Sequence, residues 1–241
     1  MGNNPFRGAS YVLRGAAIVS RPGLRRFVLV PFLVNLLLFG SLLYWGLGAL
    51  SEYIDGLLPD WLGFLSWILT PILWIGALIG SSYVFTVVAN LIAAPFNSLL
   101  AEKVETQLRG HPLNNSDEDW KAIAKKIGPT VGSELRKLKY FLIRAIPLLI
   151  LMLIPGINLI ASILWIAFTA WFMAIEYGDY PMGNHEMLFN DQQTFHKENR
   201  LSSFGFGGLL MALTTIPVVN FFAMPVGVAG ATAMWVDARP D

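Results

Sequence analysis

The chain has 241 residues, of which 55% are hydrophobic and 14% are charged, and its mean hydropathy is +0.56. Soluble domains carry about a quarter charged residues, so this composition predicts an all-α integral membrane protein. The net charge of +1 gives no reason to expect a nucleic acid as a partner, and the absence of cysteine excludes disulfides, thiolate catalysis and cysteine-based metal sites.

Residues 5–20 predict a short amphipathic helix that lies in the membrane interface and does not cross the bilayer. Two arginines, Arg7 and Arg14, stand seven residues apart in this segment. The apolar residues that recur at helical spacing are Phe6, Ala9, Leu13, Ala16 and Ala17.

The segment before the first apolar run contains three arginines, a proline and a glycine within residues 20–27. Proline suits the first turn of a helix, and Gly23 allows the backbone to come close to a ligand. The free amides of that turn, together with Arg25 and Arg26, predict an anion cradle at the entrance of a membrane helix. A second interpretation stays open, because arginines at this position also set membrane topology or contact lipid phosphates.

Two long transmembrane helices are predicted next, over residues 22–50 and 66–109. Each contains an apolar run long enough for one bilayer crossing, and the second helix continues into the cytoplasm. The polar stretch after it carries Ser-Asp-Glu-Asp at 116–119. This capping-box pattern predicts a short helix, which Gly128 and Pro129 end.

The last two apolar regions, residues 140–176 and 205–236, resemble each other because a Pro-x-x-Asn sequence interrupts each one. The interruptions begin at Pro155 and Pro217. Each half holds too few apolar residues for a comfortable span, and the uncharged tip has the residues of a turn. We therefore predict two re-entrant, half-penetrating helical hairpins. Such backbone is tolerated at membrane depth only when protein or a watery cavity surrounds it, so the repeat indicates a conduit.

The basic residues predict the orientation of the chain in the membrane. Of the 17 lysines and arginines, five lie in residues 1–26 and nine in residues 101–145, whereas residues 27–100 contain none. By the positive-inside rule both termini and the 101–145 segment are cytoplasmic in a multi-pass protein. We expect residues 1–241 to form a single membrane domain.

Polar residues in or beside the two long helices are candidates for lining a pathway. Asn35 lies in the first helix, and Asn90 and Asn97 share one face of the second. Hydrogen bonding between helices is an equally compatible role for them. The second helix ends with a charged face that offers either a structural ion pair or a gate. The residues of that face are Glu102, Glu105 and Arg109.

A further basic cluster stands at the mouth of the first predicted hairpin. Its members either draw an oxyanion inward by electrostatic steering or bind anionic lipid. They are Arg136, Lys137, Lys139 and Arg144.

Enzyme signatures are missing from the sequence. His185 and Glu186 are not followed by a histidine at position 189, which is Phe189, so the zinc-helix motif is incomplete. The glycines of residues 205–208 lack the spacing of a nucleotide-binding loop, and no Gly-x-Ser-x-Gly elbow occurs. We therefore predict no enzymatic activity, no cofactor and no metal site.

Three segments distributed over nearly the whole chain carry a resemblance to a known family. They are Gly-Leu-Arg-Arg at 23–26, Ala-Pro-Phe-Asn at 94–97 leading to Glu-Lys-Val-Glu at 102–105, and Tyr-Gly-Asp-Tyr-Pro-Met-Gly-Asn-His at 177–185. Together they resemble the CysZ-type sulfate transporters, bacterial inner-membrane proteins of the broader EI24-like superfamily.

The resemblance implies passage of sulfate across the inner membrane to supply cysteine biosynthesis. It implies a channel-like mechanism without ATP, in a homo-oligomer whose protomers have two long transmembrane helices and two pairs of half-penetrating helices. The sulfate-binding motif of the family falls on Gly23, Leu24 and Arg25, with Arg26 next to it.

We therefore expect a protein that conducts sulfate or a closely similar tetrahedral oxyanion, with sulfate and membrane lipid as its partners. The alternative is a non-conducting membrane scaffold. In that role the half-inserted hairpins shape the bilayer or recruit a partner, and the arginines hold lipid phosphate.

Overall fold

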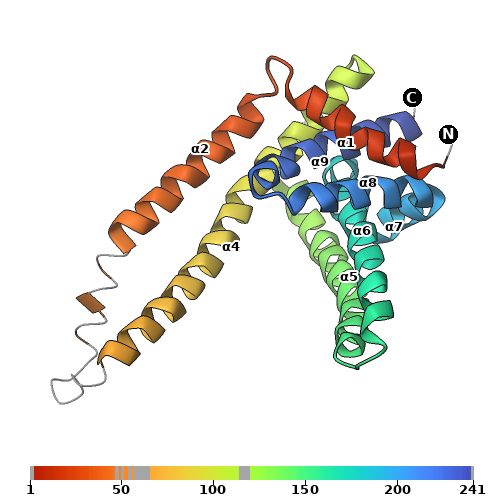
Figure 1. The fold of residues 1–241 in the computed structure, drawn as a ribbon. Helices are drawn as coiled ribbons and strands as arrows, with labels where there is room; N and C mark the ends of the chain where they lie inside the picture. The colour runs from red at the N-terminus through yellow and green to blue at the C-terminus, as the bar shows by residue number, and fades with distance from the viewer. Residues whose placement is uncertain are drawn as a thin grey trace. The chain divides into compact units, whose positions relative to one another are not determined.

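The computed structural model describes residues 3–46, 49, 52, 53, 56, 66–113 and 120–239. Across these residues the chain forms helices and no β-strand (Figure 1), which agrees with the predicted all-α fold. The backbone divides into two compact units, one made of residues 1–28 and 97–241 and the other of residues 29–96. The predicted capping box at 116–119 lies outside the described residues.

The unit of residues 29–96 consists of parts of two long helices. It contains most of α2 (Arg26–Ser41), the short π-helical segment η1 (Leu42–Gly46) and the first part of α4 (Ser66–Arg109). At about 1.5 Å per residue, α4 extends roughly 66 Å, which exceeds the roughly 30 Å hydrocarbon core of a bilayer. Large apolar side chains are exposed along both helices, which is typical of positions that face lipid. They include Leu33, Leu37, Ile75 and Ile79.

The larger unit has its core where the N-terminal helix lies against two C-terminal helices. Here α1 (Pro5–Val19) packs against α8 (Arg200–Thr214) and α9 (Pro217–Ala238) (Figure 1). A methyl group at Gly8 would overlap the carbonyl group of Ser202, so only glycine permits this approach of α1 to α8. The buried face of α1 includes Tyr11, Val12 and Ile18.

The remaining helices of this unit start with α5 (Trp120–Met152) and α6 (Asn158–Gly183), which run side by side as a hairpin (Figure 1). Then α7 (Phe189–Glu198) leads into α8. Among the described residues, two stretches are long and apolar enough to span a membrane, namely α6 and the part Val219–Ala238 of α9.

Two predicted helix boundaries are wrong. Gly128 and Pro129 do not end a helix, because α5 runs through them and packs against α6 and α7 farther along. That tertiary packing outweighs the local preference of a Gly-Pro pair. The second Pro-x-x-Asn sequence is not the tip of a turn either. Pro217 occupies the first turn of α9, where its fixed φ and missing N–H are favourable, and the break lies just before it.

His196 is a buried imidazole at the junction of α7 and α8. Its Nδ1 is 2.9 Å from the hydroxyl oxygen of Ser203, and its ring stands edge-on to Trp171 and Phe195. The side chain is 2% exposed. Burial disfavours the imidazolium, which lowers the pKa of His196 from 6.5 to about 3.

The free energy of unfolding should therefore decrease as the pH is lowered, because of this histidine. The unfolded chain takes up a proton at His196 below about pH 6.5, whereas the folded chain does not until about pH 3, so folding loses stability as the pH falls between these values. Between about pH 6.5 and pH 4.5 the loss is about 2 kcal/mol. We expect H196N, which can keep a hydrogen bond to Ser203, to lose about that much less than the unmodified chain when thermal unfolding in detergent is followed across this range. Equal slopes for the two proteins would contradict a neutral, buried His196.

Candidate functional site

The arginine-bearing turn between α1 and α2 is held by one buried leucine. Leu24 is 1% exposed and belongs to the hydrophobic core that also contains Leu100 and Val104. Gly23 precedes it with φ of 90°, a conformation that L-residues rarely adopt. The turn therefore directs Leu24 inward and leaves Arg25 and its neighbours at the surface.

The residues that carry the donors of this turn, Gly23, Arg25 and Arg26, are exposed. The Arg25 side chain donates from Nε to the carbonyl oxygen of Ser20 at 2.7 Å, which orients its guanidinium, and the guanidinium of Arg26 lies 5.1 Å from the ring centre of Phe27. In this described segment, the amides of Gly23, Arg25 and Arg26 donate no backbone hydrogen bond. The turn thus offers two exposed guanidinium groups and free amides at the start of a helix. An oxyanion accepts hydrogen bonds from donors of both kinds.

A second polar cluster lies at the end of α4, around a carboxylate that is 0% exposed. Oε1 of Glu105 is 2.7 Å from Nε of Arg109 and 2.8 Å from Nε2 of His185. Its other oxygen, Oε2, is buried without a hydrogen-bond partner. A buried charge of this kind is stable only when opposite charge and donors lie beside it, and Arg109 supplies the charge.

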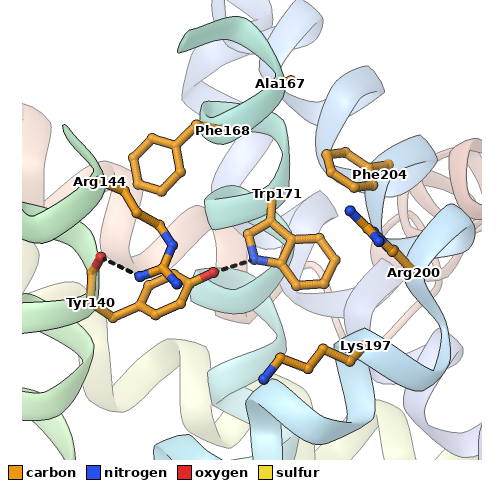
Figure 2. Close-up of a pocket in the computed structure, with 8 residues that line it drawn as sticks. All are labelled: Tyr140, Arg144, Ala167, Phe168, Trp171, Lys197, Arg200 and Phe204. Atoms are coloured by element: carbon orange, nitrogen blue, oxygen red, sulfur yellow. Dashed lines mark hydrogen bonds between the residues drawn. The ribbon is translucent and has the colours of Figure 1, made fainter. Parts of the chain in front are cut away.

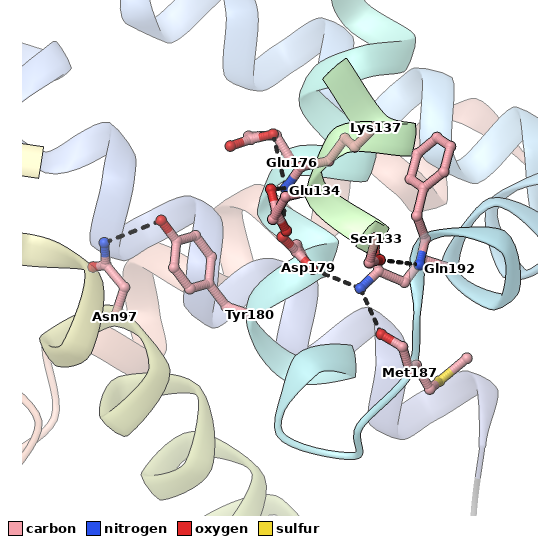
Figure 3. A network of polar contacts seen from close by, with 10 residues as sticks. Asn97, Ser133, Glu134, Lys137, Glu176, Asp179, Tyr180, Met187 and Gln192 are labelled. Carbon is pink, nitrogen blue, oxygen red and sulfur yellow. Dashed lines mark hydrogen bonds and ion pairs between the residues drawn. The ribbon is translucent and has the colours of Figure 1, made fainter. Parts of the chain in front are cut away.

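The same end of α4 holds the C-terminal end of α6 through two further contacts. The amide nitrogen of Asn97 is 3.5 Å from the hydroxyl of Tyr180 (Figure 3), and Asn184 donates to the carbonyl oxygen of Ser98 at 3.0 Å. The pairing of Glu105 with His185 joins the same two regions. The structure therefore brings together two of the predicted pathway residues, Glu105 and Arg109, and places Asn97 about two turns earlier on α4, against Tyr180.

The other predicted pathway residues do not join this cluster. Glu102 pairs with the neighbouring Lys103 at 3.5 Å, and both side chains are partly exposed. The side chains of Asn35 and Asn90 lie outside the described part of the structure.

The basic cluster predicted at the hairpin mouth is divided by the fold. Lys137 is 8% exposed, and its Nζ lies 2.6 Å from Asp179, 3.1 Å from Glu134 and 3.6 Å from Glu176 (Figure 3). Burial alone would lower the pKa of Lys137, but these carboxylates outweigh it and hold the pKa above its ordinary value. Lys137 is therefore engaged inside the protein.

Sequence reasoning missed two of these partners. Asp179 and His185 lie in the 177–185 segment that carried part of the family resemblance, but nothing in their spacing indicates contact with Lys137 or Glu105. A signal existed for one pair only, since Glu134 and Lys137 are three residues apart on a helix.

Comparison with known proteins gives a consistent result over almost the full length. The family model described as "Sulfate transporter CysZ/Etoposide-induced protein 2.4" matches residues 11–225. The chain belongs to this family. It is 44% identical to the sulfate transporter CysZ of Pseudomonas paraeruginosa (strain DSM 24068 / PA7) over 232 residues, which cover 95% of this chain and 94% of that protein. The sulfate transporter CysZ of Pseudomonas aeruginosa (strain LESB58) gives the same identity and coverage.

Membership of the CysZ family confirms the resemblance inferred from the three sequence segments. The relatives are named as transporters and not as enzymes, which agrees with the missing enzyme motifs. The apolar α6 and α9 and these relatives together identify the chain as a membrane protein.

The backbone of Gly23 can be tested directly. A side chain at this position meets no atom within 4 Å, so the cost of G23A comes from the positive φ alone and amounts to about 1 kcal/mol. Asparagine tolerates positive φ better than alanine does, so G23N should cost less. In thermal unfolding of the detergent-solubilised protein we expect G23A to lower Tm by about 2–4 °C and G23N by less. Equal Tm values for all three proteins would show that the turn does not need this backbone conformation.

The cluster at the end of α4 offers a matched pair of variants on one helix. E105Q removes the buried carboxylate that contacts both Arg109 and His185 and should lower the free energy of unfolding by about 3 kcal/mol. E102Q removes only a partly exposed pair and should change it by less than about 1 kcal/mol. Thermal unfolding measures both. A smaller effect for E105Q than for E102Q would contradict the importance of the buried pair.

Proposed function

We propose that the chain conducts sulfate across the bacterial inner membrane without ATP, by a channel-like mechanism, and so supplies sulfate for cysteine biosynthesis. The observation that carries the proposal is the turn of residues 23–26, where a buried leucine holds two exposed arginines and free amides at the start of a helix. The names of the relatives support sulfate as the ion.

The turn suits an ion that has to bind and leave again. Sulfate gives up part of its hydration shell only when directed donors replace it, and guanidinium groups and backbone amides are such donors. Because Arg25 and Arg26 are exposed, the site stays hydrated and binds weakly enough for conduction.

The cluster at the end of α4 is our candidate for the inner part of the pathway. Asn97, Glu105 and Arg109 lie in the same unit as the turn, and Leu24 shares a hydrophobic core with Val104 of that helix segment. The buried Glu105 oxygen without a partner is a group that a water molecule or a moving proton would satisfy. Asn35, Asn90 and Glu102 remain further candidates for lining.

The arrangement in the membrane is also part of the proposal. We infer that α5 and α6 form a re-entrant hairpin, because the turn that joins them lies in the middle of residues 145–175, a stretch without any charge to hold it in water on the far side. The length of α6, which alone would suffice for a crossing, is accommodated by its C-terminal part, which packs inside the protein. The second re-entrant pair is α8 with α9. An interfacial position suits α1, whose Phe6 and Leu13 are 83% and 64% exposed on the face opposite its packed side. The termini lie in the cytoplasm, residues 1–241 act as one membrane domain, and the protein works as a homo-oligomer.

Uptake of labelled sulfate into liposomes that contain the purified protein tests conduction. We expect saturable, protein-dependent uptake without ATP, and a loss of at least about tenfold in both uptake and calorimetric sulfate affinity for R25A/R26A, because each lost charge-assisted hydrogen bond is worth about 1.5–3 kcal/mol. The control K103A/R239A removes the same charge from two exposed positions outside the turn and should behave like the unmodified protein.

Two results would contradict this proposal in different ways. Absence of protein-dependent uptake would favour the non-conducting scaffold. An unchanged calorimetric isotherm for R25A/R26A would remove the turn from the mechanism even if uptake occurs.

A further inference from the structure

A cavity of about 460 Å³ lies at the base of the α5–α6 hairpin (Figure 2), and no residue of the turn 23–26 lines it. Trp171 and Phe168 of α6 and Phe204 of α8 form an aromatic wall. Three cations line the rest, from the membrane end of α5, the end of α7 and the start of α8. They are Arg144, Lys197 and Arg200.

The orientation of the first cation is fixed by neighbouring aromatic residues. The Arg144 guanidinium lies 3.6 Å from the ring centre of Tyr140 and donates to the Tyr140 carbonyl oxygen at 3.2 Å. The Tyr140 hydroxyl in turn accepts a hydrogen bond from Nε1 of Trp171 at 2.9 Å. This chain of contacts holds a positive charge against the aromatic wall of the cavity.

The charges of the cavity are not neutralised from within. None of its lining residues is acidic, and among the described residues neither Arg144, Lys197 nor Arg200 forms an ion pair. Lys197 donates only to the neutral side chain of Gln193, at 2.7 Å. Three cations without a counter-charge around one cavity fit an anion with several oxygens.

The surroundings of the cavity favour a ligand with an apolar part. Ile163 stands one helical turn before the lining residue Ala167 on α6 and is 61% exposed, and Leu201 stands one turn before Phe204 on α8 and is 49% exposed. Exposed apolar side chains at this spacing lead from the cavity towards the uncharged hairpin, where acyl chains would lie. A small inorganic oxyanion would contact the cations but would leave the aromatic wall exposed to water.

We propose that this cavity binds the phosphate of an anionic phospholipid headgroup, with its acyl chains along the exposed face of α6. Arg144, Lys197 and Arg200 hold the phosphate, and Trp171 and Phe168 cover the glycerol region. This lipid fixes the depth of the hairpin, because it ties the cationic base to the headgroup layer. The site is separate from the proposed sulfate turn and does not depend on sulfate conduction.

Native mass spectrometry of the full-length protein in detergent tests the site. The probes are phosphatidylglycerol and phosphatidylcholine with identical acyl chains, supplied in equal amounts. We expect the unmodified protein to retain phosphatidylglycerol preferentially, and R144Q/R200Q to lose that preference by about tenfold or more. The control K103Q/R239Q removes the same charge from two exposed positions that do not line the cavity and should keep it.

The test also needs a control for folding and two outcomes that would contradict the proposal. Circular dichroism and gel filtration establish that each variant is folded, and K197Q/R200Q replaces R144Q/R200Q if the latter is not. Equal retention of phosphatidylglycerol by the cavity variant and the control would overturn the proposal. It would also be overturned if the cavity variant lost a calorimetric site for free sulfate or phosphate but kept its phosphatidylglycerol, because the cavity would then serve an oxyanion from water.

Discussion

The burial of Leu24 is the contact on which the proposed function depends. Two adjacent arginines and a glycine with positive φ have no tendency to form a fixed surface by themselves, since both charges prefer water and the backbone conformation is unfavourable for most residues. Leu24 supplies the missing constraint, because it enters the hydrophobic core that also holds Leu100 and Val104. Leu24, the apolar residue in the middle of the motif, therefore fixes the turn so that Arg25 and Arg26 stay at the surface.

Buried charge has a second role in the larger unit, where it joins helices at defined positions. Glu105 contacts both Arg109 and His185, and Lys137 contacts carboxylates on α5 and α6. A buried ion pair adds little net stability, but either partner alone would be strongly unfavourable. Such pairs therefore penalise any packing of these helices that separates them.

The arginines of the two proposed sites lie in two different environments. Arg25 and Arg26 stand on an exposed turn, where water competes with any ligand for the guanidinium groups. Arg144 is stacked on Tyr140 beside an apolar hairpin, where a headgroup with acyl chains can satisfy both the charge and the hydrophobic surface. The difference lies in what surrounds the guanidinium groups, since the groups themselves are identical.

The sequence by itself determined the helical membrane class, the turn of residues 23–26 and the family, because apolar runs, Pro-Gly-Arg chemistry and short motifs are local properties of the chain. The sequence also predicts the break after α5, and Gly156 there has φ of 86°, a conformation that glycine adopts more readily than other residues. Only the tertiary structure decided that Gly128 and Pro129 lie within a helix, that Lys137 is enclosed by carboxylates, and that Arg144 meets Lys197 and Arg200 in one cavity. These outcomes depend on packing between residues distant in the chain, and no local pattern encodes which helix faces come together.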